Sequence, residues 1–331
     1  MFGREDLKDA FRVAAVETII WNMADRVVQV KGPSRTGSGI VFKANGEFYV
    51  QTSKHVVIKT CRKHAQGLVP EGTQCHGCEH RARVCNNVEV MYEDRNGSRH
   101  TTHKKETKMV GNCNSHEKAI FAIDEVPKFI KDMDIKDSEW LVADIRIKGK
   151  GRYIKGLLEY YSPNYIIHSS KTIEPRSECS IIFKNYAVKR CTQITKCSDN
   201  CSHVYFDQNL VPPEAKNHFH KDLPWKTSDD QQVVVISFCN EKKITVGEPT
   251  IDPEIQDCLI PCEQINAPTG CPPLKDVILL KHDAHVQPGD SGACVLVFGK
   301  DAESSIGYKS YMCMHIAGND QHGISSIGLI N

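Results

Sequence analysis

The sequence predicts an all-β fold made of two β-barrels, preceded by one N-terminal helix. Many short stretches alternate between apolar and polar residues, and turns rich in glycine, proline or asparagine separate them. A long helical periodicity is confined to the start of the chain. At 331 residues the chain can hold two barrels with insertions, or two barrels and a small extra module.

Residues 1–150 are expected to hold the helix and the first barrel. Apolar residues recur at spacings of three and four between residues 4 and 26, which predicts an amphipathic helix. Asn45-Gly46 is a strong signal for a two-residue hairpin turn. Between about 59 and 117, cysteine, histidine and basic residues replace the alternation, so we expect an insertion there. Short strands are expected before it at 27–31, 38–43 and 48–51.

Residues 151–331 are expected to hold the linker between the barrels and the second barrel. Two polar, cysteine-containing stretches interrupt the pattern at about 189–230 and 249–273, and we expect both to be insertions. The strands predicted for this half include 180–188, 232–239, 243–247, 277–280, 293–298, 311–317 and 323–329.

Composition and charge narrow the class of protein. The formal net charge of +1 gives no overall signal for nucleic acid or an anionic membrane. No apolar run is long enough to span a bilayer, and the N-terminus lacks the features of a signal peptide. We therefore expect a cytoplasmic protein without a membrane partner. Its 15 cysteines, an odd number, should then be thiols or metal ligands rather than a disulfide framework.

A serine flanked by glycines marks the strongest candidate site, Pro288-Gly289-Asp290-Ser291-Gly292. Glycines let the backbone turn sharply and leave room for a substrate. The N–H groups of Gly289 and Ser291 can then point into one space and hold a developing oxyanion. Asp290 is interpreted as a structural residue of the turn. The motif therefore indicates acyl-transfer chemistry with Ser291 as the nucleophile.

Two upstream residues supply the remaining parts of such a site. His55 follows a strand-like run and can take the hydroxyl proton and return it to the leaving amine. Asp144 is a lone carboxylate within an apolar alternation, where an unpartnered charge is costly, so we expect it to orient His55. The order His55, Asp144, Ser291 resembles that of the chymotrypsin-fold proteases. This resemblance implies a chymotrypsin-like double β-barrel and a serine endopeptidase that needs no cofactor for catalysis.

The segment around His315 extends this resemblance. Residues 314–319 and 321–325 look like the substrate-pocket strand of picornavirus-type main (3C-like) proteases, although the nucleophile here is serine instead of cysteine. By resemblance, His315 would donate a hydrogen bond to a glutamine or glutamate side chain just before the cleaved bond, with His285 and Val286 nearby. Such a pocket rejects apolar side chains because its own polar groups would stay unpaired. The implied substrates are peptides or polyproteins, as in viral polyprotein processing.

The expected insertion at 59–117 carries zinc-type ligands. Zinc prefers four nitrogen or sulfur ligands, often supplied as close pairs by a loop. One structural zinc is therefore a hypothesis, with His80 or Cys85 as substitute ligands. Scattered free thiols are the alternative, and the spacing does not decide between the two. The two close pairs are Cys61 with His64, and Cys75 with Cys78.

The same insertion is locally basic, which leaves RNA as a second partner to consider. We favour a solvated basic loop, because aromatic residues for stacking bases are scarce there. A zinc- and RNA-binding module with a silent protease-like core is the alternative function. The intact His55, Asp144 and Ser291 favour the enzyme.

Overall fold

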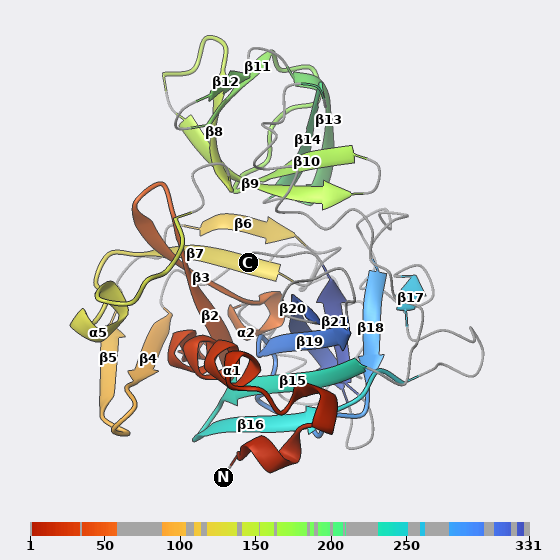
Figure 1. The fold of residues 1–331 in the computed structure, drawn as a ribbon. Helices are drawn as coiled ribbons and strands as arrows, with labels where there is room; N and C mark the ends of the chain where they lie inside the picture. Colours follow the sequence, from red (N-terminus) through yellow and green to blue (C-terminus); the bar gives the residue numbers. More distant parts are fainter. Residues whose placement is uncertain are drawn as a thin grey trace, which may run out of the picture.

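The computed structural model gives three β-sheets and few helices (Figure 1). No helix within the described ranges is long and apolar enough to cross a membrane. The described residues are 2–33, 35–57, 88–103, 109–113, 118–137, 141–151, 153–161, 164–183, 186–188, 191–198, 201–207, 209, 231–250, 259–261, 278–300, 308–318 and 323–327.

The first sheet contains seven antiparallel strands in the order β5-β4-β1-β2-β3-β7-β6. The short helix α2 (Lys54–Val57) continues directly from β3, and α5 (Lys128–Lys131) follows β7. The strands are β1 (Val27–Lys31), β2 (Thr36–Ala44), β3 (Glu47–Ser53), β4 (Glu89–Glu93), β5 (Arg99–His103), β6 (Met109–Cys113) and β7 (Lys118–Ile123).

The middle sheet also has seven strands, in the order β12-β11-β8-β9-β10-β14-β13. In Figure 1 it forms a separate curled group at the top of the molecule. Its strands are β8 (Val142–Ile147), β9 (Tyr153–Tyr161), β10 (Asn164–Ser169), β11 (Cys179–Phe183), β12 (Tyr186–Val188), β13 (Cys191–Ser198) and β14 (Cys201–Phe206).

The last sheet has the order β16-β15-β19-β20-β21-β18-β17, and its strand β15 lies against β1 and β2 of the first sheet. Helix α1 (Ala14–Arg26) lies across this junction (Figure 1). The strands are β15 (Gln231–Phe238), β16 (Lys242–Gly247), β17 (Leu259–Pro261), β18 (Ile278–His282), β19 (Cys294–Lys300), β20 (Tyr308–Gly318) and β21 (Gly323–Ile327).

The predicted all-β fold is confirmed, and so is its N-terminal helix, although the helix is shorter than expected. Two 3-10 turns (Arg4–Asp6 and Asp9–Phe11) precede α1. Val13 is extended and its N–H donates to the Phe11 carbonyl oxygen at 2.8 Å, which interrupts helical hydrogen bonding before Ala14. The interruption shifts the buried face of α1 to Val16, Ile20, Met23 and Ala24.

The predicted hairpin turn is also confirmed. Ala44 pairs with Glu47, so Asn45 and Gly46 are the two turn residues between β2 and β3. Their φ angles are 55° and 79°, as a type I′ turn requires. This turn also contacts the middle sheet, because Asn45 Nδ2 donates a hydrogen bond to the Val142 carbonyl oxygen at 2.9 Å.

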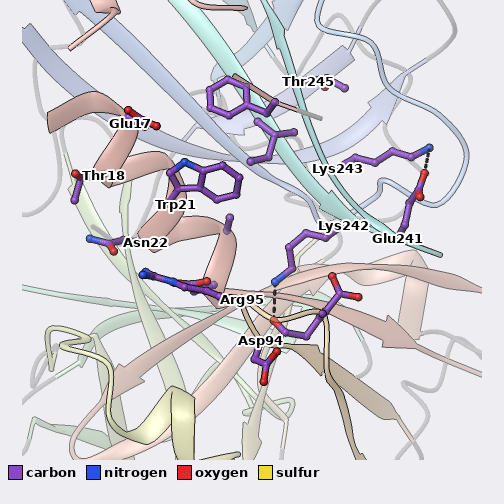
Figure 2. Close-up of a pocket in the computed structure, with 16 residues that line it drawn as sticks. Glu17, Thr18, Trp21, Asn22, Asp94, Arg95, Glu241, Lys242, Lys243 and Thr245 are labelled. Atoms are coloured by element: carbon purple, nitrogen blue, oxygen red, sulfur yellow. Dashed lines mark hydrogen bonds and ion pairs between the residues drawn. The ribbon is translucent and has the colours of Figure 1, made fainter. Parts of the chain in front are cut away.

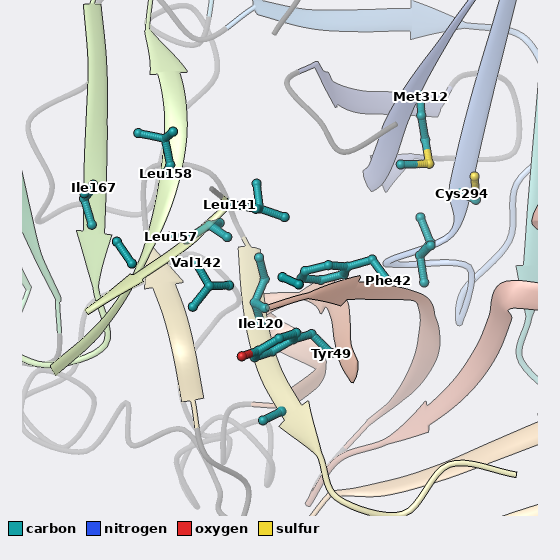
Figure 3. Packing of buried hydrophobic residues seen from close by; sticks show 14 of the residues in the cluster. Phe42, Tyr49, Ile120, Leu141, Val142, Leu157, Leu158, Ile167, Cys294 and Met312 are labelled. Atoms are coloured by element: carbon teal, nitrogen blue, oxygen red, sulfur yellow. The ribbon is translucent and has the colours of Figure 1, made fainter. Parts of the chain in front are cut away.

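An apolar core continues from the first sheet into the middle sheet. Ile120 and Tyr49 belong to the same buried cluster as Val142, Leu157 and other residues of β8 to β10 (Figure 3). Strand β6 lies against β9 and β10. The middle sheet is thus packed on the β6 side of the first sheet.

The middle sheet is the main departure from the predicted organisation. Its strands fall in part within the expected first barrel, in part within the expected linker and in part within the expected insertion at 189–230. Strands β4 to β6 likewise fall within the predicted insertion at 59–117, and β17 falls within that at 249–273. Residues 58–87, including all four proposed zinc ligands, lie outside the described residues.

The hairpin turn gives a clean test of backbone strain. Gly46→Ala should lower the free energy of unfolding by about 1–2 kcal/mol, because a Cβ is disfavoured at positive φ. No atom lies within 4 Å of the added Cβ, so the cost is conformational and not steric. Urea unfolding followed by tryptophan fluorescence measures the change.

The matched control is Gly151→Ala, which also meets no atom within 4 Å but has no positive φ. It should be neutral or slightly stabilising. Equal destabilisation by both substitutions would contradict the assigned turn.

Candidate active site

The predicted nucleophile lies in a tight turn between β18 and β19. The Asp290 N–H donates to the Gln287 carbonyl oxygen at 3.0 Å, and the Ala293 N–H donates to the Asp290 carbonyl oxygen at 2.8 Å. The Gln287 N–H donates to Asp290 Oδ2 at 2.8 Å. Gly289 and Gly292 have φ angles of 103° and 88°, which disfavour any side chain. The backbone of this turn therefore requires both glycines of the motif.

This turn packs against the ends of β2 and β3. The Ser38 N–H donates to the Ser291 carbonyl oxygen at 2.8 Å. A Cβ on Gly292 would lie 2.1 Å from the Ser38 carbonyl oxygen and 3.0 Å from the Ser53 nitrogen. Thr52 Oγ1 donates to the same Ser38 oxygen at 2.6 Å. The last sheet thus places its nucleophile turn directly on the first sheet.

His55 lies on α2, two residues beyond Ser53, and is half-buried. Gly37 lies between its segment and the nucleophile turn. A Cβ on Gly37 would be 2.6 Å from both the Ser291 carbonyl oxygen and Val56 Cγ2. Because Val56 is adjacent to His55 in sequence, these contacts bring the predicted base and nucleophile segments together.

Two further contacts join the first and last sheets beneath this site. The Phe238 N–H donates to Ser38 Oγ at 2.8 Å, and Gln51 Nε2 donates to Met314 Sδ at 3.6 Å. All four of these residues are buried. Met314 precedes His315 on β20, and β20 lies against β3. The backbone of the predicted substrate strand is therefore on the same side of the molecule as His55.

Asp290 is buried and stabilises the turn from within. It is 4% exposed, and it lies close enough to Cys239 for its charge to act on that thiol. Burial, and then the Asp290 charge, raise the pKa of Cys239. A Cβ on Gly289 would lie 2.3 Å from Cys239 Sγ. The underside of the nucleophile turn is thus filled by a protonated thiol and a carboxylate.

The two residues predicted beside the substrate pocket differ in exposure. His285 is exposed, and its carbonyl oxygen accepts a hydrogen bond from Thr245 Oγ1 at 2.9 Å. Val286 is 2% exposed and belongs to the apolar cluster inside the last sheet, with Val235 and Val295. Val286 is therefore a core residue with almost no surface to offer a substrate.

The prediction that Asp144 shares a barrel with His55 is wrong, because Asp144 lies on β8 of the middle sheet. There its backbone pairs with Ile182 on one side and Lys155 on the other. Its Oδ1 atom is 3.0 Å from Lys155 Nζ, in an ion pair that is partly exposed. The sequence pattern predicts that the Asp144 charge has a partner, and in the structure this partner is Lys155.

Asp144 also lies toward the opposite end of β3 from His55. Val142, two residues earlier, accepts the hydrogen bond from Asn45 in the hairpin turn. Burial and neighbouring carboxylates that include Asp144 raise the pKa of Tyr49, which is near this turn. A strand of seven residues such as β3 is roughly 20 Å long. The structure does not bring Asp144 to the end of β3 that leads to His55.

Strand β7 is the element that lies beside the His55 end of β3. Lys118, its first residue, pairs with Ser53. Glu117 directly precedes Lys118 in sequence and lies outside the described residues.

A cavity of about 1030 Å³ lies away from this candidate site (Figure 2). It is bounded by α1, the β4–β5 turn and the β15–β16 turn. Trp21 is 41% exposed in it, and Lys242 Nζ donates to the Glu93 carbonyl oxygen at 2.9 Å. Burial lowers the pKa of Lys242, while nearby carboxylates oppose this shift. None of the predicted catalytic residues lines this cavity.

No group of three or more His, Cys, Asp or Glu side chains within the described ranges could hold a metal ion. The predicted zinc ligands Cys61, His64, Cys75 and Cys78 are not among those residues. The zinc hypothesis stays a prediction from sequence.

Solved structures show a distant similarity to this chain. The crystal structure of Deg5 aligns with a TM-score of 0.36 at 13% sequence identity, and the alignment covers 93% of this chain and 87% of the Deg5 chain. The Rv3671c protease, in an inactive form, aligns with a TM-score of 0.35 at 12% sequence identity, over 93% of this chain and 86% of the protease chain. A human pathogenic astrovirus serine protease aligns with a TM-score of 0.18 at 13% sequence identity, over 57% of this chain and 94% of the astrovirus chain. No family model and no curated protein matches the sequence. At these TM-scores the similarity does not establish what this chain does.

Gly292 offers a test of the contact between the nucleophile turn and the first sheet. Gly292→Ala should lower the free energy of unfolding by more than the 1–2 kcal/mol or so expected from positive φ alone, because the Cβ would overlap the Ser38 carbonyl oxygen. Urea unfolding measures this change. The control is Gly299→Ala, whose Cβ would meet its nearest atom at 3.9 Å without positive φ. A Gly292→Ala protein as stable as the control would refute the close packing of the Ser291 turn on Ser38.

Proposed function

We propose that the protein is a serine endopeptidase in which Ser291 is the nucleophile and His55 is the general base. The observation that carries this proposal is the packing of the Ser291 turn on the end of β3 that leads into His55. Ser38, Gly37 and Gly292 make the contacts. A serine hydroxyl becomes an effective nucleophile when an imidazole within hydrogen-bond reach accepts its proton.

The turn geometry also supports an oxyanion hole. The hydrogen bonds that close the turn use the N–H groups of Gln287, Asp290 and Ala293. The N–H groups of Gly289 and Ser291 are not used in these bonds, which leaves them for a developing oxyanion. Removing one such donor typically costs about 10²–10³-fold in turnover.

The proposed reaction has two steps. Ser291 Oγ attacks the carbonyl carbon of the substrate while His55 accepts the hydroxyl proton, and His55 then protonates the leaving amine. Water attacks the resulting ester, with His55 again accepting a proton, and the acid product is released as Ser291 regains its hydrogen. No step requires a metal or an organic cofactor.

The proposed substrates are peptides or polyproteins cut after glutamine or glutamate. This part rests on the resemblance of the His315 segment to the pocket strand of 3C-like proteases, and on the place of β20 against β3. His315 would read the substrate side chain, and His285 is exposed close to the nucleophile turn in sequence. Val286 is excluded as a substrate contact by its burial.

Cleavage of a mixed peptide library tests the proposal. Wild-type protein should cut, and Ser291→Ala and His55→Ala should each reduce kcat by at least about 10⁴-fold, because nucleophile and base act as a unit. The residue before each cut tests His315, and cuts after arginine or leucine would discard the glutamine or glutamate preference alone. Failure of the wild type to cut, together with no labelling of Ser291 by a fluorophosphonate probe, would refute the enzyme.

The residue that orients His55 can be identified by a pair of carboxylate-to-amide substitutions. Asp144→Asn should leave kcat within about twofold, because Asp144 is partnered by Lys155 in another sheet and a partly exposed ion pair contributes little. Glu117→Gln should lower kcat strongly, by up to about 10⁴-fold, because we propose that Glu117, the carboxylate that precedes β7 in sequence, orients the imidazole. The reverse pattern, a large loss with Asp144→Asn only, would restore the original assignment.

The alternative function, a zinc- and RNA-binding module with a silent core, gains no support from the described residues. Its zinc ligands lie outside the described ranges, and within those ranges no metal-binding group occurs.

A further inference from the structure

Two cysteines of the middle sheet lie next to each other although they come from strands near its opposite ends. Cys179 begins β11 and Cys191 begins β13, and both are free thiols. In the sheet order, β11 is next to one end and β13 is the other end. The curling of the sheet brings β11 and β13 into contact.

The two thiols are joined by a hydrogen bond in which Cys191 donates to the sulfur of Cys179. Cys179 is 6% exposed and belongs to the buried apolar cluster, while Cys191 is half-buried and packs against that cluster. Solvent therefore reaches the pair from the Cys191 side. Neighbouring strands fix both backbones, since Cys179 pairs with Ile147 and Cys191 pairs with Phe206.

The surroundings make the two sulfurs chemically unequal. The hydrogen bond from Cys191 lowers the pKa of Cys179, burial opposes this, and the positive charge of Lys150 lowers it further. The same hydrogen bond, together with burial, raises the pKa of Cys191. Because the thiolate is the reactive form of cysteine, Cys179 is the attacking sulfur and Cys191 is the thiol that resolves the product.

We propose that Cys179 and Cys191 are a peroxide-responsive dithiol that forms a reversible disulfide across the seam of the middle sheet. The Cys179 thiolate attacks one oxygen of hydrogen peroxide, the O–O bond breaks, and hydroxide leaves and becomes water on protonation. Cys191 then attacks the sulfenic sulfur of Cys179, the S–O bond breaks, and a second water is released. In total, two thiols and one peroxide give one disulfide and two waters, and a dithiol reductant reverses the change.

Such a bond would connect the two ends of the sheet covalently. Without it, β11 and β13 are in contact across a seam that the backbone ladder does not cross. A disulfide restricts the unfolded chain and resists separation of the strands that it joins. Oxidation should therefore protect the middle sheet from local opening and leave the junction at Ser38 untouched.

The sequence makes the test direct, because trypsin separates the two cysteines. Cleavage after Arg176, Lys184, Arg190 and Lys196 leaves Cys179 in peptide 177–184 and Cys191 in peptide 191–196, each with a single cysteine. Full-length protein is treated with a small excess of hydrogen peroxide, blocked with N-ethylmaleimide and digested without reductant. We expect a cross-linked pair of these two peptides, lighter than their sum by two hydrogen atoms, that dithiothreitol separates.

Two single variants complete the experiment. In Cys191→Ser, the cross-link should disappear and dimedone should trap the sulfenic acid on peptide 177–184, since the resolving thiol is gone. In Cys179→Ser, the Cys191 thiol should react with peroxide much more slowly than the Cys179 thiol does in Cys191→Ser, because burial still raises the pKa of Cys191. The matched control is the single-cysteine peptide containing Cys239, which should stay unlinked.

The proposal is overturned if peroxide leaves both peptides separate and blocked by N-ethylmaleimide while other thiols are oxidised. It is equally overturned if Cys179 or Cys191 is found linked to other cysteines as often as to each other. Because the readout on wild-type protein requires no substitution, a variant that fails to fold does not weaken the test.

Discussion

The contact between the Ser291 turn and Ser38 is the constraint on which the candidate site depends. Ser38 uses its N–H, its carbonyl oxygen and its hydroxyl oxygen to bind Ser291, Thr52 and Phe238. A single buried residue of β2 thus connects the nucleophile turn, the strand that leads to His55 and the first strand of the last sheet. The hydrogen bonds to Thr52 and Phe238 are buried, so breaking either one would leave an unpaired polar group that costs about 1–3 kcal/mol. The two halves of the site therefore hold a fixed relative position.

Local patterns in the sequence were sufficient where a structure is determined locally. The Asn45-Gly46 turn and the glycines around Ser291 were predictable because a positive φ restricts the residue type at each position. The buried central strands were predictable for a related reason, since β3, β15 and β19 must present apolar side chains. That Ser291 and His55 act together stays a prediction from their chemistry, while the structure shows the Ser291 turn packed on the end of β3 that leads to His55.

The missed elements are those whose placement depends on distant partners. Strands β5, β6, β13 and β17 lie at the edges of their sheets, where polar residues such as those of β5 (Arg99–His103) are tolerated, so they were interpreted as insertions. The sheet expected for Asp144 was wrong for a similar reason. Its alternating surroundings correctly indicated a strand and a partnered charge, but nothing local specified which sheet the strand joins or that the partner is Lys155.

The polar character of the edge strands has a consequence for the behaviour of the protein at high concentration. Within the described residues the three sheets have six outer strands, and an uncovered outer strand has main-chain groups that another molecule could pair with. On β5, a strand from a second molecule would have to approach beside the exposed side chains of Arg99 and His100, and it would desolvate them. The polar side chains that make β5 hard to predict from apolar alternation thus also disfavour the intermolecular pairing that leads to aggregation.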